Sequence, residues 1–153
     1  MSVKEKLSAL GLTLPTAAAP VAAYVPAVKS GNLIFTAGQL PVVDGKLVKE
    51  GKVGSAVSAD DAKELAQLCA LNALAAILLV AELDQIERVV RVGGFVNCAP
   101  GFTAIPGVVN GASELLIKIF GDINGKHART AVGVAELALN APVEIEMVVQ
   151  LKN

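Results

Sequence analysis

Aromatic and reactive side chains are scarce in this sequence of 153 residues, which has no tryptophan, one tyrosine, four phenylalanines and one histidine. Proteins that bind single-stranded nucleic acid stack the bases on aromatic rings, and few rings are present here. The two cysteines, Cys69 and Cys98, form no CxxC motif and have no clustered histidine partner. We therefore expect no metal site, and a reducing, cytoplasmic environment.

Charged residues are also few, at 18% of the sequence, and the 13 basic and 14 acidic side chains are scattered along the chain. Binding to a phosphate backbone needs lysines and arginines gathered on one surface, and the sequence shows no such cluster. The sequence therefore predicts no nucleic-acid partner.

Hydrophobic residues, by contrast, reach 54%. The longest apolar run, residues 73–81, is far shorter than the ~20 residues that span a bilayer. We interpret the wider stretch 65–83 as a buried helix, because charged residues precede it and no aromatic or basic anchors flank it, and residues 1–12 do not resemble a signal peptide. We expect no membrane partner. A domain of this size buries only about 70% of its unfolded surface, so the apolar excess predicts a subunit interface.

Local patterns in the first half of the chain predict a strand, a hairpin and a helix. Residues 13–26, rich in proline and alanine, are expected to be an extended lead-in, and residues 32–36 a buried strand. Asp44-Gly45 between two apolar arms predicts a hairpin at residues 41–48. Ser58, followed by acidic residues, can cap a helix that continues to Ala81.

The second half predicts a strand, a helix and two more strands. Residues 86–97 form a central strand, in which Gly93-Gly94 indicates a bulge or a close backbone approach. Residues 108–120 form a helix that Gly121 ends, and residues 130–137 and 143–151 form neighbouring strands. This order predicts an α+β domain, residues 21–153, with two helices packed on one face of a mixed sheet and residues 1–20 as an N-terminal extension.

Three charged residues interrupt the apolar C-terminal strands. Alternation places Glu144 and Glu146 on one face of their strand, and an unpaired charge there is costly if the strand is interior. Arg129 could supply the compensating charge. The alternative is an ordinary arginine at a strand end and two solvated glutamates on an open face of the sheet.

Two motifs and a tyrosine carry a resemblance to a known family. They are Gly38-Gln39-Leu40-Pro41 after a hydrophobic strand, Arg129 followed fifteen residues later by Glu144 in a VEIE strand, and Tyr24 upstream of both. The sequence resembles the reactive intermediate deaminase family, which is also called RidA or YjgF-like and is also labelled endoribonuclease L-PSP. The resemblance spans residues 20–150.

This resemblance implies a chorismate-mutase-like fold assembled as a homotrimer, with three clefts built between subunits. It implies hydrolysis of reactive imine or enamine intermediates of amino-acid metabolism to 2-keto acids and ammonia, without a cofactor. The ligand would be a small imine or keto acid that bears a carboxylate.

The resemblance also assigns roles to five residues. Arg129 would bind the substrate carboxylate through two parallel hydrogen bonds, and Glu144 would handle water and protons. Tyr24 would border the cleft from the neighbouring subunit. Asn110 and the backbone at Gly38 would contact the substrate.

Some positions depart from the family pattern. Ala37 stands where a serine is common and Ala131 where a cysteine is common, and these changes suit a bulkier or more apolar ligand. A protein that binds a carboxylate without turnover is therefore one alternative, and an endoribonuclease or translation inhibitor is another. His127 is interpreted as a solvated loop side chain, and Cys98 as an unreactive thiol.

Overall fold

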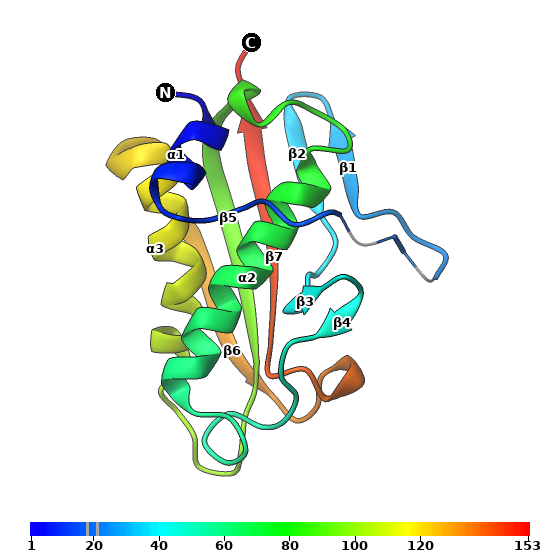
Figure 1. The fold of residues 1–153 in the computed structure, drawn as a ribbon, viewed down its shortest axis with the longest axis vertical. Coiled ribbons are helices and arrows are strands. Elements are labelled where there is room, and N and C mark those ends of the chain that lie inside the picture. The colour runs from blue at the N-terminus through cyan, green and yellow to red at the C-terminus, as the bar shows by residue number, and fades with distance from the viewer. Residues whose placement is uncertain (18, 21) are drawn as a thin grey trace.

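A single five-stranded sheet organises the chain, of which the computed structural model describes residues 1–17, 19–20 and 22–153. All neighbouring strands are antiparallel except β5 and β6, which run parallel (Figure 1). The strands, in their order across the sheet, are β1 (Ala27–Ser30), β2 (Leu33–Thr36), β7 (Val143–Leu151), β5 (Ile86–Asn97) and β6 (Ala128–Val134).

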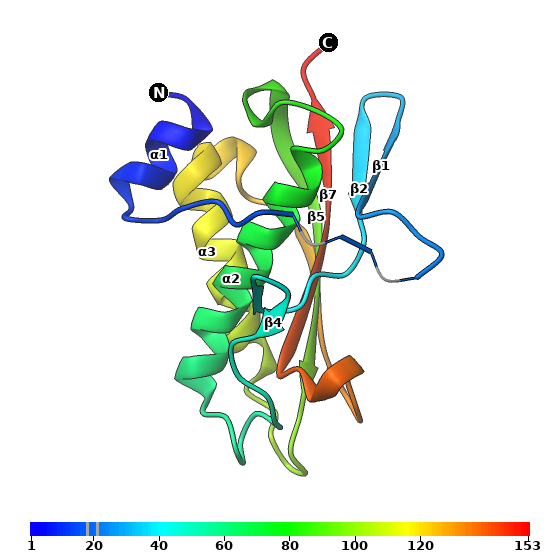
Figure 2. The same ribbon diagram turned by 45° about the vertical axis from the view of Figure 1, so that its right-hand side comes forward.

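Helices α2 (Ala59–Ile77) and α3 (Ile105–Asn124) cover one face of this sheet, and the described residues place no α-helix on the other face (Figures 1 and 2). This confirms the predicted α+β class with two helices on one face. A third helix, α1 (Val3–Ala9), was not predicted; Ser2 and Glu5 form a reciprocal capping box at its start, and its buried Val3 and Leu7 join the core.

The start of α2 is as predicted, but its end is not. The Ser58 hydroxyl accepts a hydrogen bond from the Asp61 N–H and caps the helix. The helix ends at Ile77 and not at Ala81. The amides of residues 80 and 81 both bond to the Ile77 carbonyl in a turn that leads the chain toward β5, and residues 78–80 are exposed. The apolar run therefore continues past the edge of the core, where helical packing no longer stabilises it.

Helix α3 begins three residues before the prediction, and Gly121 breaks it as expected. Gly121 has φ of 84°, which glycine tolerates without steric cost, and a short remainder of the helix follows to Asn124.

The predicted hairpin is also present. Strands β3 (Val42–Val43) and β4 (Lys46–Leu47) flank Asp44 and Gly45, whose positive φ values match a type I′ turn.

Most of the predicted strands lie close to their predicted positions, but one predicted pairing is wrong. Strands β5 and β7 have the predicted bounds, whereas β6 ends earlier than residue 137. The prediction that the last two strands are neighbours was wrong, because α3 returns the chain parallel to β5 and β5 lies between β6 and β7. Strand β1 was not predicted, because it falls just after the expected lead-in. Of residues 13–26, Ala18 and Val21 lie outside the described residues.

Close packing, and not a bulge, explains Gly93-Gly94. The irregularities of β5 lie nearer its start, between residues 86 and 91. A side chain at Gly93 would overlap that of Glu146, and one at Gly94 would overlap Val109 of α3.

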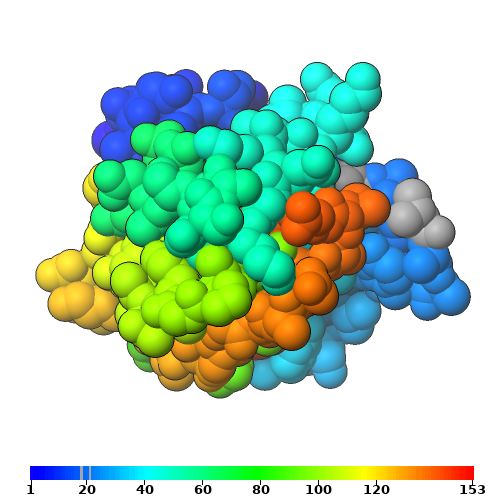
Figure 3. Space-filling model, turned by 90° about the horizontal axis from the view of Figure 1, so that it is seen from below, coloured from blue at the N-terminus to red at the C-terminus, as the bar shows by residue number. Residues whose placement is uncertain are grey.

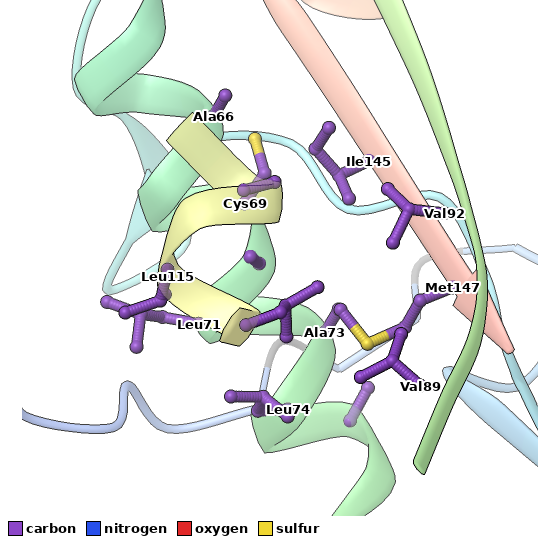
Figure 4. Close-up of a cluster of buried hydrophobic side chains, with 14 of the residues drawn as sticks. Ala66, Cys69, Leu71, Ala73, Leu74, Val89, Val92, Leu115, Ile145 and Met147 are labelled. Carbon is purple, nitrogen blue, oxygen red and sulfur yellow. The ribbon is translucent and has the colours of Figure 1, made fainter. Parts of the chain in front are cut away.

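The core lies between the helices and the covered face of the sheet, where α2 supplies small side chains such as Ala66 and Ala73 and β7 supplies Ile145 and Met147 (Figure 4).

The loops near residues 52, 98 and 136 lie together at the lower end of the molecule, which Figure 3 shows from below. The fully buried Asn97 joins them, accepting from Lys52 Nζ at 2.9 Å and donating to Asn140 at 3.2 Å. None of the described helices combines the length and hydropathy needed to cross a bilayer.

The face without helices is apolar at its sides. Val28, Phe35 and Val132 are exposed there at 51%, 45% and 39%. Glu144 and Glu146 project from β7 onto the same face, because Val143 and Ile145, with which they alternate, are buried. The predicted shared face of the two glutamates is therefore confirmed.

We predict that two glycines of α3 respond oppositely to alanine. A methyl group at Gly111 would overlap the Lys63 carbonyl of α2, so Gly111→Ala should lower the free energy of unfolding by about 1–3 kcal/mol. Gly107 faces open space, and Gly107→Ala should raise it by up to about 1 kcal/mol. Urea unfolding of both variants measures this difference, and equal effects would contradict the tight α2–α3 contact.

Candidate functional site

Arg129 lies on the edge strand β6 and points toward α3. Its Nη1 donates to Asn110 Oδ1 at 2.7 Å and to Ser113 Oγ at 3.2 Å, and its Nη2 donates to the Pro106 carbonyl at 3.5 Å. All three acceptors belong to α3, and Asn110 and Ser113 are one turn apart and so share a helix face. The structure therefore brings together two residues named from the sequence, Arg129 and Asn110, and adds Ser113.

The charge of Arg129 has no negative partner within the described residues. The four ion pairs recorded there all involve lysines, and every acceptor around the half-buried guanidinium is a neutral oxygen. Such an arrangement orients the guanidinium and keeps its full charge. It is suited to holding an anion.

His127 is not the solvated loop side chain that we expected. It is partly buried, and its Nε2 lies 2.9 Å from Ser113 Oγ while its Nδ1 lies 2.6 Å from the Gly125 carbonyl oxygen. Burial lowers the pKa of His127; the hydrogen bond to Gly125 opposes this shift and the charge of Arg129 adds to it. No sequence pattern indicated this contact, because it depends on the packing of α3 against the chain that enters β6.

A second group of residues lies on the face of the sheet without helices. Gly38 contacts the side chain of Glu144 so closely that a methyl group in its place would overlap the carboxylate. Reciprocal backbone bonds between Gln39 and Ile145, of 2.8 and 3.0 Å, hold this segment against β7. The buried Asn72 of α2 supports it by donating to the carbonyls of Leu40 and Val42. Glu144 and Gly38, both named from the sequence, are thus brought together.

Glu144 is an unusual carboxylate for an open sheet face. Partial burial raises its pKa, and the neighbouring charge of Glu146 raises it further. A carboxyl group tuned in this way exchanges protons more readily near neutral pH than an ordinary glutamate does. Glu146, two residues further along β7, lines a hollow of about 80 Å³ together with Phe35 and Arg91 among others.

The two groups lie on opposite faces of the sheet. Arg129 is in register with Met147 across the sheet, and its side chain faces α3. Glu144 is in register with Val132, and its side chain faces away from the helices. Within one chain, Arg129 therefore does not compensate the charge of Glu144, as we had expected it to do. Tyr24 is 52% exposed and precedes β1, at the edge of the sheet opposite β6, so one chain does not bring it to Arg129 either.

Other reactive groups do not gather into a centre. Within residues 1–17, 19–20 and 22–153, no three His, Cys, Asp or Glu side chains are grouped as metal ligands would be. Burial raises the pKa of Cys98, whose sulfur faces the Cα of Gly133 on β6. Cys69 of α2 is fully buried, and its thiol donates to the Val143 carbonyl of β7 at 3.7 Å.

We predict that Asn110→Asp stabilises the fold while neutralising Arg129. The new carboxylate would replace an amide oxygen 2.7 Å from Nη1 and gain about 0.5–1 kcal/mol, or about 1–4 °C in Tm. Pairing depresses the pKa of the new carboxyl in the folded state. The gain should therefore be present above pH ~4 and be lost as the pH falls below it.

Thermal unfolding from pH 3 to pH 8 measures this effect. Asn124→Asp, at the other end of α3, is the matched control and should show no such gain. An unchanged or lower Tm for Asn110→Asp at pH 7 would mean that Arg129 already has a negative partner.

Both the sequence and the structure of this chain are similar to those of known proteins. Residues 4–151 match the family described as YjgF/chorismate mutase-like, putative endoribonuclease. The structure is similar to that of Atu1372 from Agrobacterium tumefaciens, a protein of unknown function, with 42% identity and a TM-score of 0.89 over 99% of this chain and 94% of that one.

Two further structures extend the comparison. A protein from Shewanella oneidensis, described as a putative endoribonuclease, is 30% identical, with a TM-score of 0.93 over 99% of this chain and 100% of that one. Escherichia coli TdcF, whose structure contains bound serine, is 18% identical, with a TM-score of 0.66 over 91% of this chain and 94% of that one, and so shows likeness of fold alone.

Proposed function

The chain belongs to the YjgF/chorismate-mutase-like family, and from this membership and the geometry around Arg129 we propose that it hydrolyses reactive imines or enamines of small amino acids. The products are 2-keto acids and ammonia. The observation that carries the proposal is the guanidinium of Arg129, which three neutral oxygens orient and no carboxylate neutralises in the described chain. The carboxylate of the substrate completes this arrangement.

Two copies of the chain build each site in this proposal. Arg129 and Asn110 come from one copy, and Gly38, Glu144 and Tyr24 come from the helix-free face and the β1 edge of the next. The apolar side chains of that face, such as Phe35 and Val132, support such an assembly, because contact with another copy removes them from water. Three copies arranged in a ring repeat the same contact and leave no half-site unused.

The chemistry needs few groups. Arg129 fixes the carboxylate, so the adjacent imine carbon has a set position. Glu144 takes a proton from water as the oxygen bonds to the carbon of the protonated imine, whose nitrogen becomes a neutral amine. Glu144 gives this proton to the amine nitrogen and takes up the proton of the new hydroxyl group as the carbon–nitrogen bond breaks. It passes that proton to the departing ammonia, so the keto acid and an ammonium ion leave. One water is consumed for each imine, and no electrons are transferred.

Binding without turnover is the second candidate function. Ala37 and Ala131 carry no hydroxyl or thiol, so the polar groups of the proposed site are limited to those named above. Escherichia coli TdcF, which shares this fold, has been crystallised with serine, so small-ligand binding occurs in a protein of this shape. Ribonuclease activity has less support, because the net charge of −1 provides no attraction to a phosphate backbone.

We predict that the protein accelerates release of keto acid from an imino acid produced in situ by an amino-acid oxidase. Arg129→Gln should reduce kcat/KM by about 10–100-fold, the loss expected for a charge-assisted pair. Arg88→Gln changes an exposed arginine of β5 and is the matched control. The assay follows the appearance of keto acid and compares its rate with that of the same mixture without the protein.

The outcomes separate the candidates. A rate equal to buffer overturns the deaminase proposal. If Arg129-dependent binding of 2-oxobutanoate persists in that case, the protein is a carboxylate-binding protein. RNA cleavage that survives removal of contaminating nucleases and requires Arg129 would instead favour the ribonuclease.

We also predict that two inactive variants restore activity when they share a trimer. Arg129→Gln and Glu144→Gln chains, co-expressed in equal amounts with different tags, should regain about a quarter of the wild-type activity per site. Random assembly pairs an intact Arg129 with an intact Glu144 of the next copy at that frequency. Purification through both tags isolates the mixed trimers, in which the expected fraction rises to about a third, because one of their three sites joins an intact Arg129 to an intact Glu144.

A double variant provides the control. Chains with both substitutions, co-expressed with wild type, should leave about a quarter of the sites intact if two copies build a site, and about half if one copy does. No recovery in the first mixture together with half activity in the second would overturn the shared site while leaving the reaction itself supported.

A further inference from the structure

A continuous chain of hydrogen bonds leads from Arg129 into the protein. Arg129 Nη1 donates to Ser113 Oγ at 3.2 Å, Ser113 Oγ lies 2.9 Å from His127 Nε2, and His127 Nδ1 lies 2.6 Å from the Gly125 carbonyl oxygen. Ser113 is 8% exposed. The mechanism proposed above uses neither Ser113 nor His127.

The hydrogen-bond partners of His127 and Ser113 determine which of their atoms carry hydrogens. A carbonyl oxygen can only accept, so Nδ1 of His127 carries a hydrogen and donates it to Gly125. In the neutral imidazole Nε2 is then an acceptor, and the Ser113 hydroxyl donates to it. The same hydroxyl oxygen accepts from Arg129. Ser113 is therefore a donor on one side and an acceptor on the other.

We propose that this chain couples binding of a carboxylate at Arg129 to the uptake of a proton by His127, with Ser113 changing from donor to acceptor. The inference rests on the proposed function for the nature of the ligand. His127 and Ser113 are positioning residues here, because they act on the ligand through Arg129.

The charges around His127 determine the direction of the coupling. The charge of Arg129 acts on His127 and disfavours its protonation. Asp122, in the last turn of α3, and Lys126, in the connection to β6, lie on the surface and pair with each other at 3.6 Å. No ion pair within the described chain offsets Arg129.

A bound carboxylate supplies the missing negative charge. It cancels the repulsion between Arg129 and the imidazolium, so the pKa of His127 rises when the ligand binds. By linkage, affinity for the carboxylate increases as the pH falls through the bound-state pKa and levels off below the free-state pKa. Ser113 can turn its hydrogen away and accept from the newly protonated Nε2. The proton thus arrives at His127 together with the ligand at Arg129.

Nuclear magnetic resonance can measure this coupling directly, because His127 is the one histidine of the sequence. Its Cε1–H resonance, followed from pH 4 to pH 9, should give a pKa below 6.5 in the free protein. Saturating benzoate should raise this pKa, and the ratio of benzoate affinities at low and high pH should be about tenfold for each unit of the rise. Benzamide, which has the same shape without charge, should leave it unchanged.

Three variants test the separate links. Arg129→Gln should raise the pKa of His127 in the free protein and remove its response to benzoate. Ser113→Ala removes the acceptor for the new proton and should at least halve the response. His127→Gln keeps an acceptor for Ser113 and should bind benzoate with an affinity that no longer varies between pH 5 and pH 8.

The outcomes distinguish this inference from the function on which it rests. If benzoate binds in an Arg129-dependent manner and the His127 pKa does not move, the coupling is wrong and the carboxylate site stands. If no carboxylate binds at all, both are overturned. If Ser113→Ala responds as fully as wild type, the serine takes no part in the coupling.

Discussion

Helices cover only one face of the sheet, and the other features of this structure depend on that constraint. Helices α2 and α3 bury Val143, Ile145 and Met147 of β7, so the residues between them must face the other way. Because side chains alternate along a strand, a shift of β7 by one residue would place both Glu144 and Glu146 beneath the helices. The burial of two adjacent carboxylates would cost far more free energy than apolar packing could offset. The position of the acidic pair is thus enforced by the same packing that forms the core.

The same constraint separates Arg129 from Glu144. Strand β6 is at the sheet edge, where the side chain of Arg129 reaches past the strand to the first turns of α3. Glu144 projects from the middle of the sheet on the opposite face. In the proposed trimer the helix-free face of one copy meets this edge of the next. Burial of the exposed Phe35 and Val132 and completion of the site then occur in a single contact, which gives the excess of apolar residues a role in catalysis as well as in assembly.

Features that depend on neighbouring residues in the sequence were predictable, and features that depend on pairing at a distance were not. Alternation over nine residues gives the bounds of β7, and a serine before acidic residues gives the start of α2. The parallel pairing of β5 with β6 has no local signal, since it depends on where α3 returns the chain. Likewise, Arg129 and Asn110 could be named from motifs. The link to His127 could not, although the spacing of Asn110 and Ser113 on one helix face is a hint of shared contacts.

The identity of the groups around Arg129 argues for a ligand rather than a structural ion pair. An aspartate at position 110 would orient the guanidinium as well as the asparagine does, and would also neutralise it. An amide oxygen, a hydroxyl and a backbone carbonyl orient it and leave its charge intact. A half-buried charge held in this manner is unfavourable to folding, and in the proposed function the carboxylate of the substrate removes this cost when it binds. Burial lowers the pKa of His127 and the charge of Arg129 lowers it further, so a second cation beside Arg129 is disfavoured in the free protein.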